Sequence, residues 1–514
     1  MTENTNEKPA GKGPRNAVVI LLDSLNRHML GAYGGSEFQT PNLDRFATRS
    51  VRFNKHYAGA LPCMPARHDI LCGAWDFLWR PWGSIEIWED AITYELSKAG
   101  VKSQLISDHP HLFETGGENY HVDFSAWDYQ RGHEGDLWKT KADPSWAGAP
   151  NFGRTHMPYD DSRGYFKGEE DFPGPRTMQA AANWLDDNAG AHDRFFLFVD
   201  EFDPHEPFDT PEHYASMYDP DWEGPHMIWP PYMKGAIEKG VLTERQAQQI
   251  RACYGGKLTM IDHWFGKILD AMDRHNLWDD TMFVLCTDHG HYLGEKDLWG
   301  KPGVPIYQTL GHIPLMISMP GVDPGTCDAL TTSVDIFATL ADQFGIEKGI
   351  RHRTHGKSLL PLLSGEKTEV REWLLSGVWG REVHYIDGTH KYVRGAGGAN
   401  RPISMFSNRW STMPTHFLRR EDELPLPDSR AILDRMPGSK VPVIRQAWGE
   451  GDRLPYWAPP DLGPNLLFDV ENDPTEENDL SGSALAAQMA EKLHSAMRSV
   501  EAPDDQFIRL GFEK

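Results

Sequence analysis

Short, continuous runs of apolar residues alternate with helical patterns along this chain, and this alternation constrains its fold most strongly. The apolar runs of strand length are Ala17 to Leu22, Val101 to Ile106, Phe195 to Val199, Met282 to Cys286 and Ile313 to Ile317. Helical periodicity occurs at Pro41 to Thr48, with Thr40 as N-cap, and at Ala91 to Lys98, Ala247 to Asn276 and Val334 to Phe344. Strands that are apolar on both faces are typical of parallel sheets covered by helices. The alternation predicts an α/β sandwich around a large, mostly parallel mixed sheet.

The pattern of the chain changes after about Gly365, which predicts a second structural unit. The 514 residues exceed the usual size of one domain. Short alternating apolar pieces, separated by turns such as Asp387-Gly388, predict a short antiparallel sheet, and a final helix is predicted near Ala484 to Val500. We expect a large α/β domain over residues 1–370 and a smaller C-terminal α+β subdomain over residues 371–514. Residues 117–175 show little periodicity and are expected to form an insertion that lies over the sheet.

The charge of the chain argues against partners that require a basic surface. The formal net charge is 51 minus 75, or −24, which disfavours nonspecific binding to nucleic acid or to an anionic membrane. The segment Met1 to Arg15 is polar and lacks the apolar stretch of a signal peptide. The five cysteines are scattered, which fits a reducing compartment, and Cys286 is expected to be buried. We therefore expect a cytoplasmic protein without membrane spans.

Cys63-Met64-Pro65-Ala66-Arg67 is the most distinctive short segment because it has the form C-x-P-x-R. Average residue usage makes a chance match in a chain of this length an event on the order of a few per cent. Pro65 suits the first turn of a helix, and the residues up to Leu71 can continue it. Such a helix places residue 63 at its N-terminus, where unpaired N–H groups favour a bound anion. A loop cysteine ahead of an ordinary helix is the alternative interpretation.

Polar residues that can bind metal ions follow directly after four of the predicted strands. They are Asp23, Asp108-His109-Pro110-His111, Asp203-Pro204-His205 and Asp288-His289-Gly290. Because ligands bind beyond the carboxyl ends of parallel strands, we expect these residues to converge. Carboxylate oxygens with one imidazole, as Asp23, Asp288 and His289 supply, suit Mn²⁺ or Ca²⁺. A single strand-end aspartate is more often a turn former, and a lysine such as Lys301 usually lies on the surface. Only the combination of these residues indicates a site.

Several longer segments, taken together with the C-x-P-x-R motif, resemble the sulfatase family of the alkaline phosphatase superfamily. They are Leu21-Leu22-Asp23, Gly31-Ala32-Tyr33-Gly34, Thr40 to Asp44, Asp203 to Phe208, Thr287 to Gly290 with the continuation to Lys301, Ser333 to Ile336, Gly356 to Leu363, and Leu467 to Pro474. The resemblance covers most of the chain and extends to the phosphonate monoester hydrolases. It implies an alkaline-phosphatase-like α/β/α sandwich with a C-terminal α+β subdomain.

The resemblance also implies the chemistry of residue 63. In this family a formylglycine-generating enzyme oxidises the cysteine of C-x-P-x-R to formylglycine, an aldehyde that works as its hydrate. The implied metal ligands are Asp23, Asp288, His289 and the modified residue 63, and Arg67 is implied to hold the hydrate. His205 and Lys301 resemble the pair that contacts the sulfate and the leaving-group oxygen. His111 occupies the position of the histidine that deprotonates the second hydroxyl of the hydrate.

Three positions depart from the pattern of many sulfatases. Ser24 stands where a second aspartate is common, which argues against Ser24 as a ligand, and His289 stands where asparagine is common. His109 replaces a substrate-binding lysine two residues before the catalytic histidine. Fewer carboxylates and an added imidazole favour Mn²⁺, although Ca²⁺ is common in the family.

The sequence therefore predicts a formylglycine- and metal-dependent hydrolase of small sulfate monoesters, arylsulfatase-like, that acts through a sulfo-enzyme intermediate at residue 63. Hydrolysis of phosphonate monoesters or phosphodiesters at the same site is the first alternative. A non-catalytic, metal-dependent anion-binding protein with unmodified Cys63 is the second. Association into a homo-oligomer is left open. Aromatic side chains between the motif and the insertion are expected either to line an aryl pocket or to pack in the core: Trp75, Trp79, Trp82, Trp88, Trp127 and Trp138.

Overall fold

An eight-stranded mixed sheet forms the centre of the protein. The computed structural model describes residues 14–141, 146, 148–152, 158–301, 305–410, 427–455 and 457–512. The strand order is β11-β2-β10-β7-β1-β5-β3-β4. The strands are β1 (Asn16–Leu22), β2 (Val51–Tyr57), β3 (Lys102–Ser107), β4 (Ala126–Tyr129), β5 (Phe195–Glu201), β7 (Thr281–Cys286), β10 (Leu315–Ser318) and β11 (Gly325–Thr332). Only β10 runs antiparallel to its neighbours within this described sheet, which confirms the predicted mostly parallel architecture.

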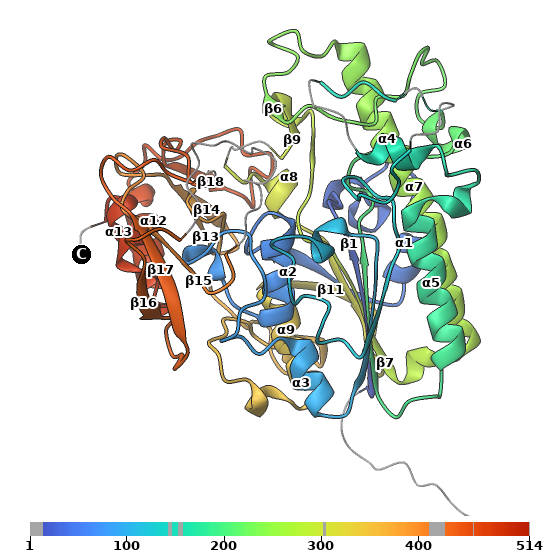
Figure 1. Cartoon of the computed structure of the whole chain (residues 1–514), viewed down its shortest axis with the longest axis horizontal. Coiled ribbons are helices and arrows are strands. Elements are labelled where there is room, and N and C mark those ends of the chain that lie inside the picture. Colours follow the sequence, from blue (N-terminus) through green and yellow to red (C-terminus); the bar gives the residue numbers. More distant parts are fainter. Residues whose placement is uncertain are drawn as a thin grey trace, which may run out of the picture.

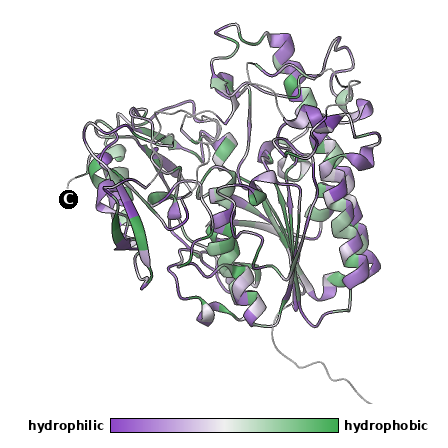
Figure 2. Ribbon diagram, viewed as in Figure 1, coloured by the Kyte–Doolittle hydropathy of each residue, from purple (hydrophilic) through white to green (hydrophobic). Residues whose placement is uncertain are grey.

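Helices cover both faces of this sheet, as the apolar strands require (Figure 1). On one face lie α1 (Pro41–Ala47), α5 (Pro173–Asn188) and α7 (Glu244–Arg274); on the other lie α2 (Cys63–Cys72), α3 (Ile92–Lys98) and α9 (Val334–Phe344). Hydrophobic residues line the sheet and the helix faces turned towards it, whereas the outer sides of α5 and α7 are hydrophilic (Figure 2). The remaining α-helices of the described residues are α4 (Pro158–Arg163), α6 (Glu212–Ala215), α8 (Gln308–Gly311), α10 (Leu360–Leu363), α12 (Leu485–Ser499) and α13 (Asp504–Arg509).

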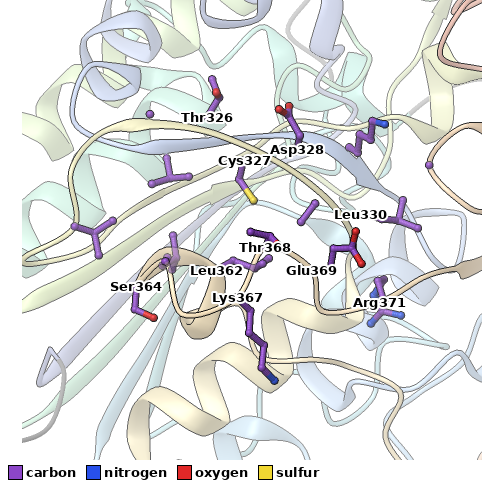
Figure 3. Close-up of a pocket in the computed structure, with 18 of the residues that line it drawn as sticks. Thr326, Cys327, Asp328, Leu330, Leu362, Ser364, Lys367, Thr368, Glu369 and Arg371 are labelled. Carbon is purple, nitrogen blue, oxygen red and sulfur yellow. The ribbon is translucent and has the colours of Figure 1, made fainter.

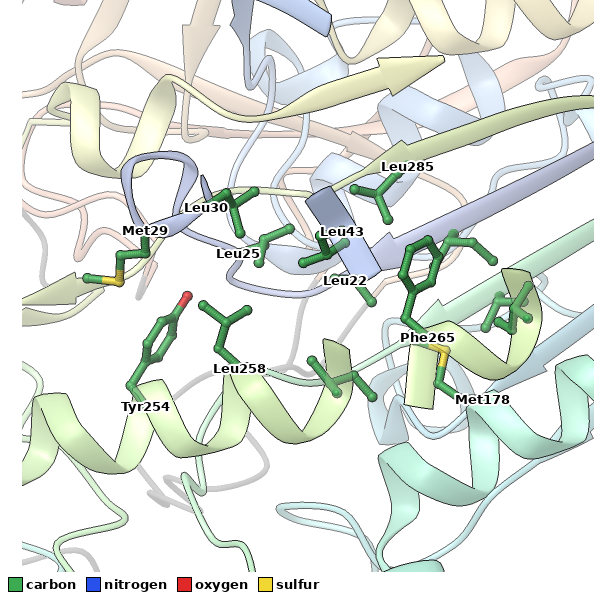
Figure 4. Close-up of a cluster of buried hydrophobic side chains, with 14 of the residues drawn as sticks. Leu22, Leu25, Met29, Leu30, Leu43, Met178, Tyr254, Leu258, Phe265 and Leu285 are labelled. Atoms are coloured by element: carbon green, nitrogen blue, oxygen red, sulfur yellow. The ribbon is translucent and has the colours of Figure 1, made fainter. Parts of the chain in front are cut away.

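Strand β1 shows how one apolar run serves two cores. Its residues Val18, Ile20 and Leu22 pack with α1, α5 and α7 in one cluster, while the alternate residues pack with α2, α3 and α9 in the other. Figure 4 shows the first cluster, where Leu43 of α1 and Phe265 of α7 lie near Leu22. Because side chains alternate across a strand, a run that is apolar at every position is buried on both faces.

Three strands of the central sheet were not predicted, because their sequences carry polar residues. Strand β2 contains Arg52, Asn54 and Lys55, which are partly exposed, and most of β4 is exposed. Both β4 and β11 form edges of the sheet, where one side of the strand faces solvent. The segment 117–175 was expected to lie over the sheet. That expectation was wrong in part, because β4 pairs in parallel with β3 and extends the sheet.

The C-terminal part forms small antiparallel sheets, as predicted. One contains β12 (Leu374–Gly377), β13 (Val383–Ile386), β14 (His390–Arg394) and β18 (Leu466–Asp469); another contains β15 (Ile403–Ser407), β17 (Pro442–Trp448) and β16 (Ile432–Arg435). A third small sheet joins β6 (Met233–Lys234), β9 (Leu298–Gly300) and β8 (Tyr292–Leu293) near the top of Figure 1. Trp75 and Trp79 share a hydrophobic cluster with Leu374 and Met497, so the C-terminal sheets pack directly on the segment after α2. The boundary at residues 370 and 371 stays a prediction.

Among the described residues, no helix combines the length and apolar character that a bilayer crossing requires. Residues 1–13, which make up most of the polar N-terminal segment, lie outside the described part of the chain.

A carboxylate from a distant helix accepts the hydrogen bonds of the first N–H groups of α1. Thr40 occupies the N-cap position, but its side chain makes no capping hydrogen bond and instead accepts one from the Gly31 N–H at 3.3 Å. Asp262 of α7 accepts hydrogen bonds from the backbone N–H groups of Asn42 at 3.0 Å and Leu43 at 2.7 Å. The predicted N-cap position of Thr40 is therefore confirmed, while Asp262 supplies the capping oxygen atoms.

We predict that Asp262→Ala lowers the free energy of unfolding by about 1–3 kcal/mol, because two helix N–H groups lose their buried acceptor. Thr40→Val, which removes only one long hydrogen bond, should cost less. Urea unfolding of both variants at one pH measures the difference. A larger loss for Thr40→Val would contradict the assignment of the cap.

Candidate active site

Four side chains with metal-binding atoms meet at the carboxyl edge of the central strands. Asp23 follows β1, Asp288 and His289 follow β7, and Cys63 is the first residue of α2. All four residues are buried, and one donor atom from each lies within 4.8 Å of the others. The Cys63 Sγ atom is 3.4 Å from His289 Nε2, and this imidazole nitrogen is 3.1 Å from the Asp288 carboxylate. The structure thus brings together the four residues predicted as metal ligands.

The buried guanidinium of Arg67 is the centre of this arrangement. It donates hydrogen bonds to Asp200 Oδ1 at 2.6 Å and to Asp288 Oδ2 at 3.0 Å, and its Nη2 lies 2.9 Å from Asp23 Oδ2. It also donates to the backbone carbonyl of Cys63 at 3.1 Å. Arg67 therefore reaches residue 63 through the backbone, while its charge faces three carboxylates.

The charges of the site fit a divalent cation. Three carboxylates, of Asp23, Asp200 and Asp288, face one guanidinium, so full ionisation leaves this group with two negative charges, of which the nearby Lys301 ammonium offsets one. Burial and the neighbouring Asp288 raise the pKa of Asp23 well above its ordinary value. Burial also lowers the pKa of His289 to about 4, so its imidazole is neutral and can bind a metal. Oxygen ligands with one imidazole suit Mn²⁺ or Ca²⁺.

Ser24 supports the predicted ligands by hydrogen bonds. Its hydroxyl donates to Asp23 Oδ1 at 2.8 Å, and its backbone N–H donates to Asp288 Oδ1 at 3.0 Å. The backbone of Ser24 has a φ of 63°, in the left-handed region that residues other than glycine rarely adopt. The tight turn after β1 thus aims two neighbouring groups at the two carboxylates.

His205 and Lys301 form a pair beside Cys63. The Lys301 Nζ atom lies 2.7 Å from His205 Nε2 and 3.8 Å from Cys63 Sγ. The other ring nitrogen of His205 lies 2.7 Å from the Glu206 carbonyl oxygen, so it carries the proton, and Nε2 accepts from Lys301. Burial lowers the pKa of His205 well below its ordinary value. The pKa of Lys301 lies well above its ordinary value. Burial alone would lower it, but the electrostatic effect of Cys63, Tyr232 and Glu206 outweighs burial. The lysine therefore holds the proton of this pair.

His109 and His111 pack against Phe202, whose ring also stacks on His205. The rings of Phe202 and His205 stack at 4.2 Å, and the ring centroid of His109 is 4.3 Å from that of Phe202. His109 is fully buried, and neither of its ring nitrogens has a hydrogen-bond partner among the described residues. His111 is only partly buried; one ring nitrogen bonds to Glu114, and the other lies 3.6 Å from Glu134. The roles of both histidines stay predictions.

The sequence did not reveal several residues that contact this site. Asp200 is the next-to-last residue of the buried strand β5, and a charge at the end of an apolar run is the signal that could have identified it. Glu206 accepts hydrogen bonds from Tyr232 and from His291, the latter at 3.1 Å, and thereby fixes the backbone segment that carries His205. Glu134 belongs to the unpatterned insertion, where no local signal marks it.

The tryptophans are mostly structural. Trp75, Trp79 and Trp88 belong to a buried cluster, whereas Trp127 is 49% exposed. Of the six predicted tryptophans, Trp82 contacts a site residue among the described ring contacts. Its ring packs edge-on against that of His111, with the ring centroids 4.9 Å apart.

A cavity of about 970 Å³ lies elsewhere, between β11 and residues 362–372. Figure 3 shows the Cys327 side chain directed into it. Every predicted site residue lies outside its lining.

Comparison with known proteins agrees with this geometry. The family model described as Sulfatase matches residues 15–346. The chain is 27% identical to a choline-sulfatase of Rhizobium meliloti, over 74% of this chain and 78% of that protein. It is 25% identical to an arylsulfatase of Clostridium perfringens, over 70% of this chain and 80% of that protein. The fold matches a phosphonate monoester hydrolase of Agrobacterium radiobacter with a TM-score of 0.62 and 18% identity, over 95% of each chain. Because the family model spans well over half of its residues, this chain belongs to the sulfatase family of hydrolases.

Proposed function

We propose that this protein hydrolyses small sulfate monoesters with a formylglycine formed from Cys63. The position of the residue 63 side chain is the observation that carries this proposal. It lies at the N-terminus of α2, 3.4 Å from a predicted metal ligand and 3.8 Å from the Lys301 ammonium. A nucleophile there faces a cation on one side and a proton donor on the other. Maturation by a formylglycine-generating enzyme and a cytoplasmic location remain parts of the same proposal.

Asp23, Asp288, His289 and residue 63 would hold a divalent ion, which supplies Lewis-acid polarisation of the bound ester and of the nucleophile. One hydroxyl of the formylglycine hydrate loses its proton to solvent and attacks sulfur as an oxyanion, and the bond between sulfur and the leaving-group oxygen breaks. Lys301 gives its proton to the departing oxygen, because His205 beside it is neutral. The sulfuryl group is then bound to residue 63, and Arg67 fixes the carboxylates that surround it.

Release of sulfate requires only a proton transfer at residue 63. His111 takes the proton of the second hydroxyl, the carbonyl bond of the aldehyde forms, and the bond from carbon to the sulfate oxygen breaks. Sulfate leaves without attack of water on sulfur, and a water molecule then rehydrates the aldehyde. A thiol at residue 63 has no second hydroxyl and cannot release sulfate in this way.

Phosphonate monoester or phosphodiester hydrolysis is the first alternative, since the fold also matches a phosphonate monoester hydrolase. A non-catalytic anion-binding protein with unmodified Cys63 is the second, and the absence of turnover in protein from a host with the maturation enzyme would favour it.

We predict that Cys63→Ser reduces kcat for an aryl sulfate by on the order of a thousandfold or more, because the hydrate cannot form. Cys327→Ser is the matched control, since Cys327 lines the cavity of Figure 3 and should retain full activity. Circular dichroism of both variants checks the fold. Near-normal turnover by Cys63→Ser would refute the covalent role.

Asp200→Asn should weaken binding of Mn²⁺ or Ca²⁺ by about 10–100-fold. The substitution removes one negative charge from the site and replaces the carboxylate whose two oxygens accept hydrogen bonds from Arg67. Calorimetric titration of chelator-treated protein measures the affinity directly. The metal-dependent rise in melting temperature should shrink in parallel. An unchanged Kd would show that Asp200 has no part in the metal site.

We predict that one purified sample hydrolyses 4-nitrophenyl sulfate with a higher kcat/KM than the corresponding phenyl phosphonate ester. Steady-state kinetics under identical conditions, with saturating metal, give the ratio. If the phosphonate ester is preferred by orders of magnitude, the alternative activity replaces the first proposal.

A further inference from the structure

A loop of the insertion carries a carboxylate to the active centre. In this loop, residues 131–136, His133 Nε2 lies 2.7 Å from Oδ1 of Asp203, which follows the end of β5 by two residues. This contact anchors one side of the loop. Asp136 anchors the other side through a two-point ion pair with Arg131 and a hydrogen bond from the Gly132 N–H at 2.6 Å. Between these buried anchors, Glu134 has a φ of 34°, a left-handed conformation uncommon outside glycine. The loop thus holds Glu134 in a defined place.

The carboxylate of Glu134 lies between the two histidines that act on the substrate. One of its oxygens is 3.6 Å from His111 Nε2, and an oxygen is within 4.8 Å of a ring nitrogen of His205. His205 pairs with Lys301, the residue that protonates the leaving-group oxygen in the proposed reaction. Glu134 therefore stands beside the leaving group.

The exposed side chains of the site show where the leaving group extends. The side chains of Arg67, Asp23 and Asp288 are completely buried. Those of His111, Glu134 and Glu114 are 13%, 14% and 30% exposed. Lys301 is partly buried as well, so solvent reaches the site along the side that carries Lys301, His111 and the two glutamates. A leaving group that extends past His111 from the bound sulfate passes the two carboxylates.

A negative charge at this place selects among leaving groups. It repels an anionic leaving group and attracts a cationic one, and partial burial strengthens both effects. We propose that Glu134 determines specificity for sulfate esters whose leaving group carries an ammonium group near the ester oxygen. This inference rests on the proposed sulfatase function.

Two isosteric esters test the proposal: 2-aminoethyl sulfate, which carries an ammonium group, and propyl sulfate, which carries a methyl group in its place. We expect the wild-type protein to prefer the ammonium ester by about tenfold in kcat/KM, the effect of a partly screened ion pair. Glu134→Gln should remove most of this preference by lowering kcat/KM for the ammonium ester, with propyl sulfate changed less than about twofold. Intrinsic differences in reactivity between the esters cancel when the two proteins are compared.

Asp128→Asn is the matched control, because Asp128 is an exposed acidic residue of the same insertion, on β4, and should leave the ratio unchanged. If Glu134→Gln slows both esters equally, Glu134 serves His111 and the inference is overturned. If the wild-type protein hydrolyses 4-nitrophenyl sulfate without preferring 2-aminoethyl sulfate over propyl sulfate, the inference also fails while the proposed function stands. If it hydrolyses no sulfate ester, the proposed function itself fails.

Discussion

The site depends on one buried guanidinium that faces three buried carboxylates. Arg67 bonds to Asp200 and Asp288 and lies 2.9 Å from Asp23, and solvent reaches almost none of these side chains. A buried ion costs several kcal/mol of desolvation, so each member of the group requires its partners. Because three carboxylates outnumber one guanidinium, the group retains negative charge that a dication offsets.

The spacing of the C-x-P-x-R motif places Arg67 within this buried charged group. Cys63 and Arg67 are separated by one helical turn, so they lie on the same face at the start of α2. Arg67 donates to the Cys63 carbonyl and turns its charge towards the carboxylates after β1, β5 and β7. The motif thereby fixes the nucleophile against the ends of the central strands. In the proposed reaction the leaving group extends past His111 and Glu134, whose side chains are partly exposed.

Local patterns were sufficient to predict the parts of the fold that are buried on both faces. The run from Ala17 to Leu22 predicted β1, and the residues after the strands predicted that Asp23, Asp288 and His289 would meet. Strands β2, β4 and β11 were missed because half-exposed strands carry polar residues that resemble loops. The cap of α1 comes from Asp262, over 200 residues away, and no local pattern contains such a contact. Glu134 was missed for the same reason, since only the tertiary contacts of its loop bring it to His111.

Long-wavelength anomalous diffraction from crystals of the active protein tests the central claim most directly, because sulfur and a bound metal ion both scatter anomalously. We predict sulfur peaks at Cys72 and Cys286, no sulfur peak at the side chain of residue 63, and one strong metal peak among Asp23, Asp288 and His289. A sulfur peak at residue 63 in fully active protein, or a metal ion bound away from these three residues, would contradict the proposed chemistry.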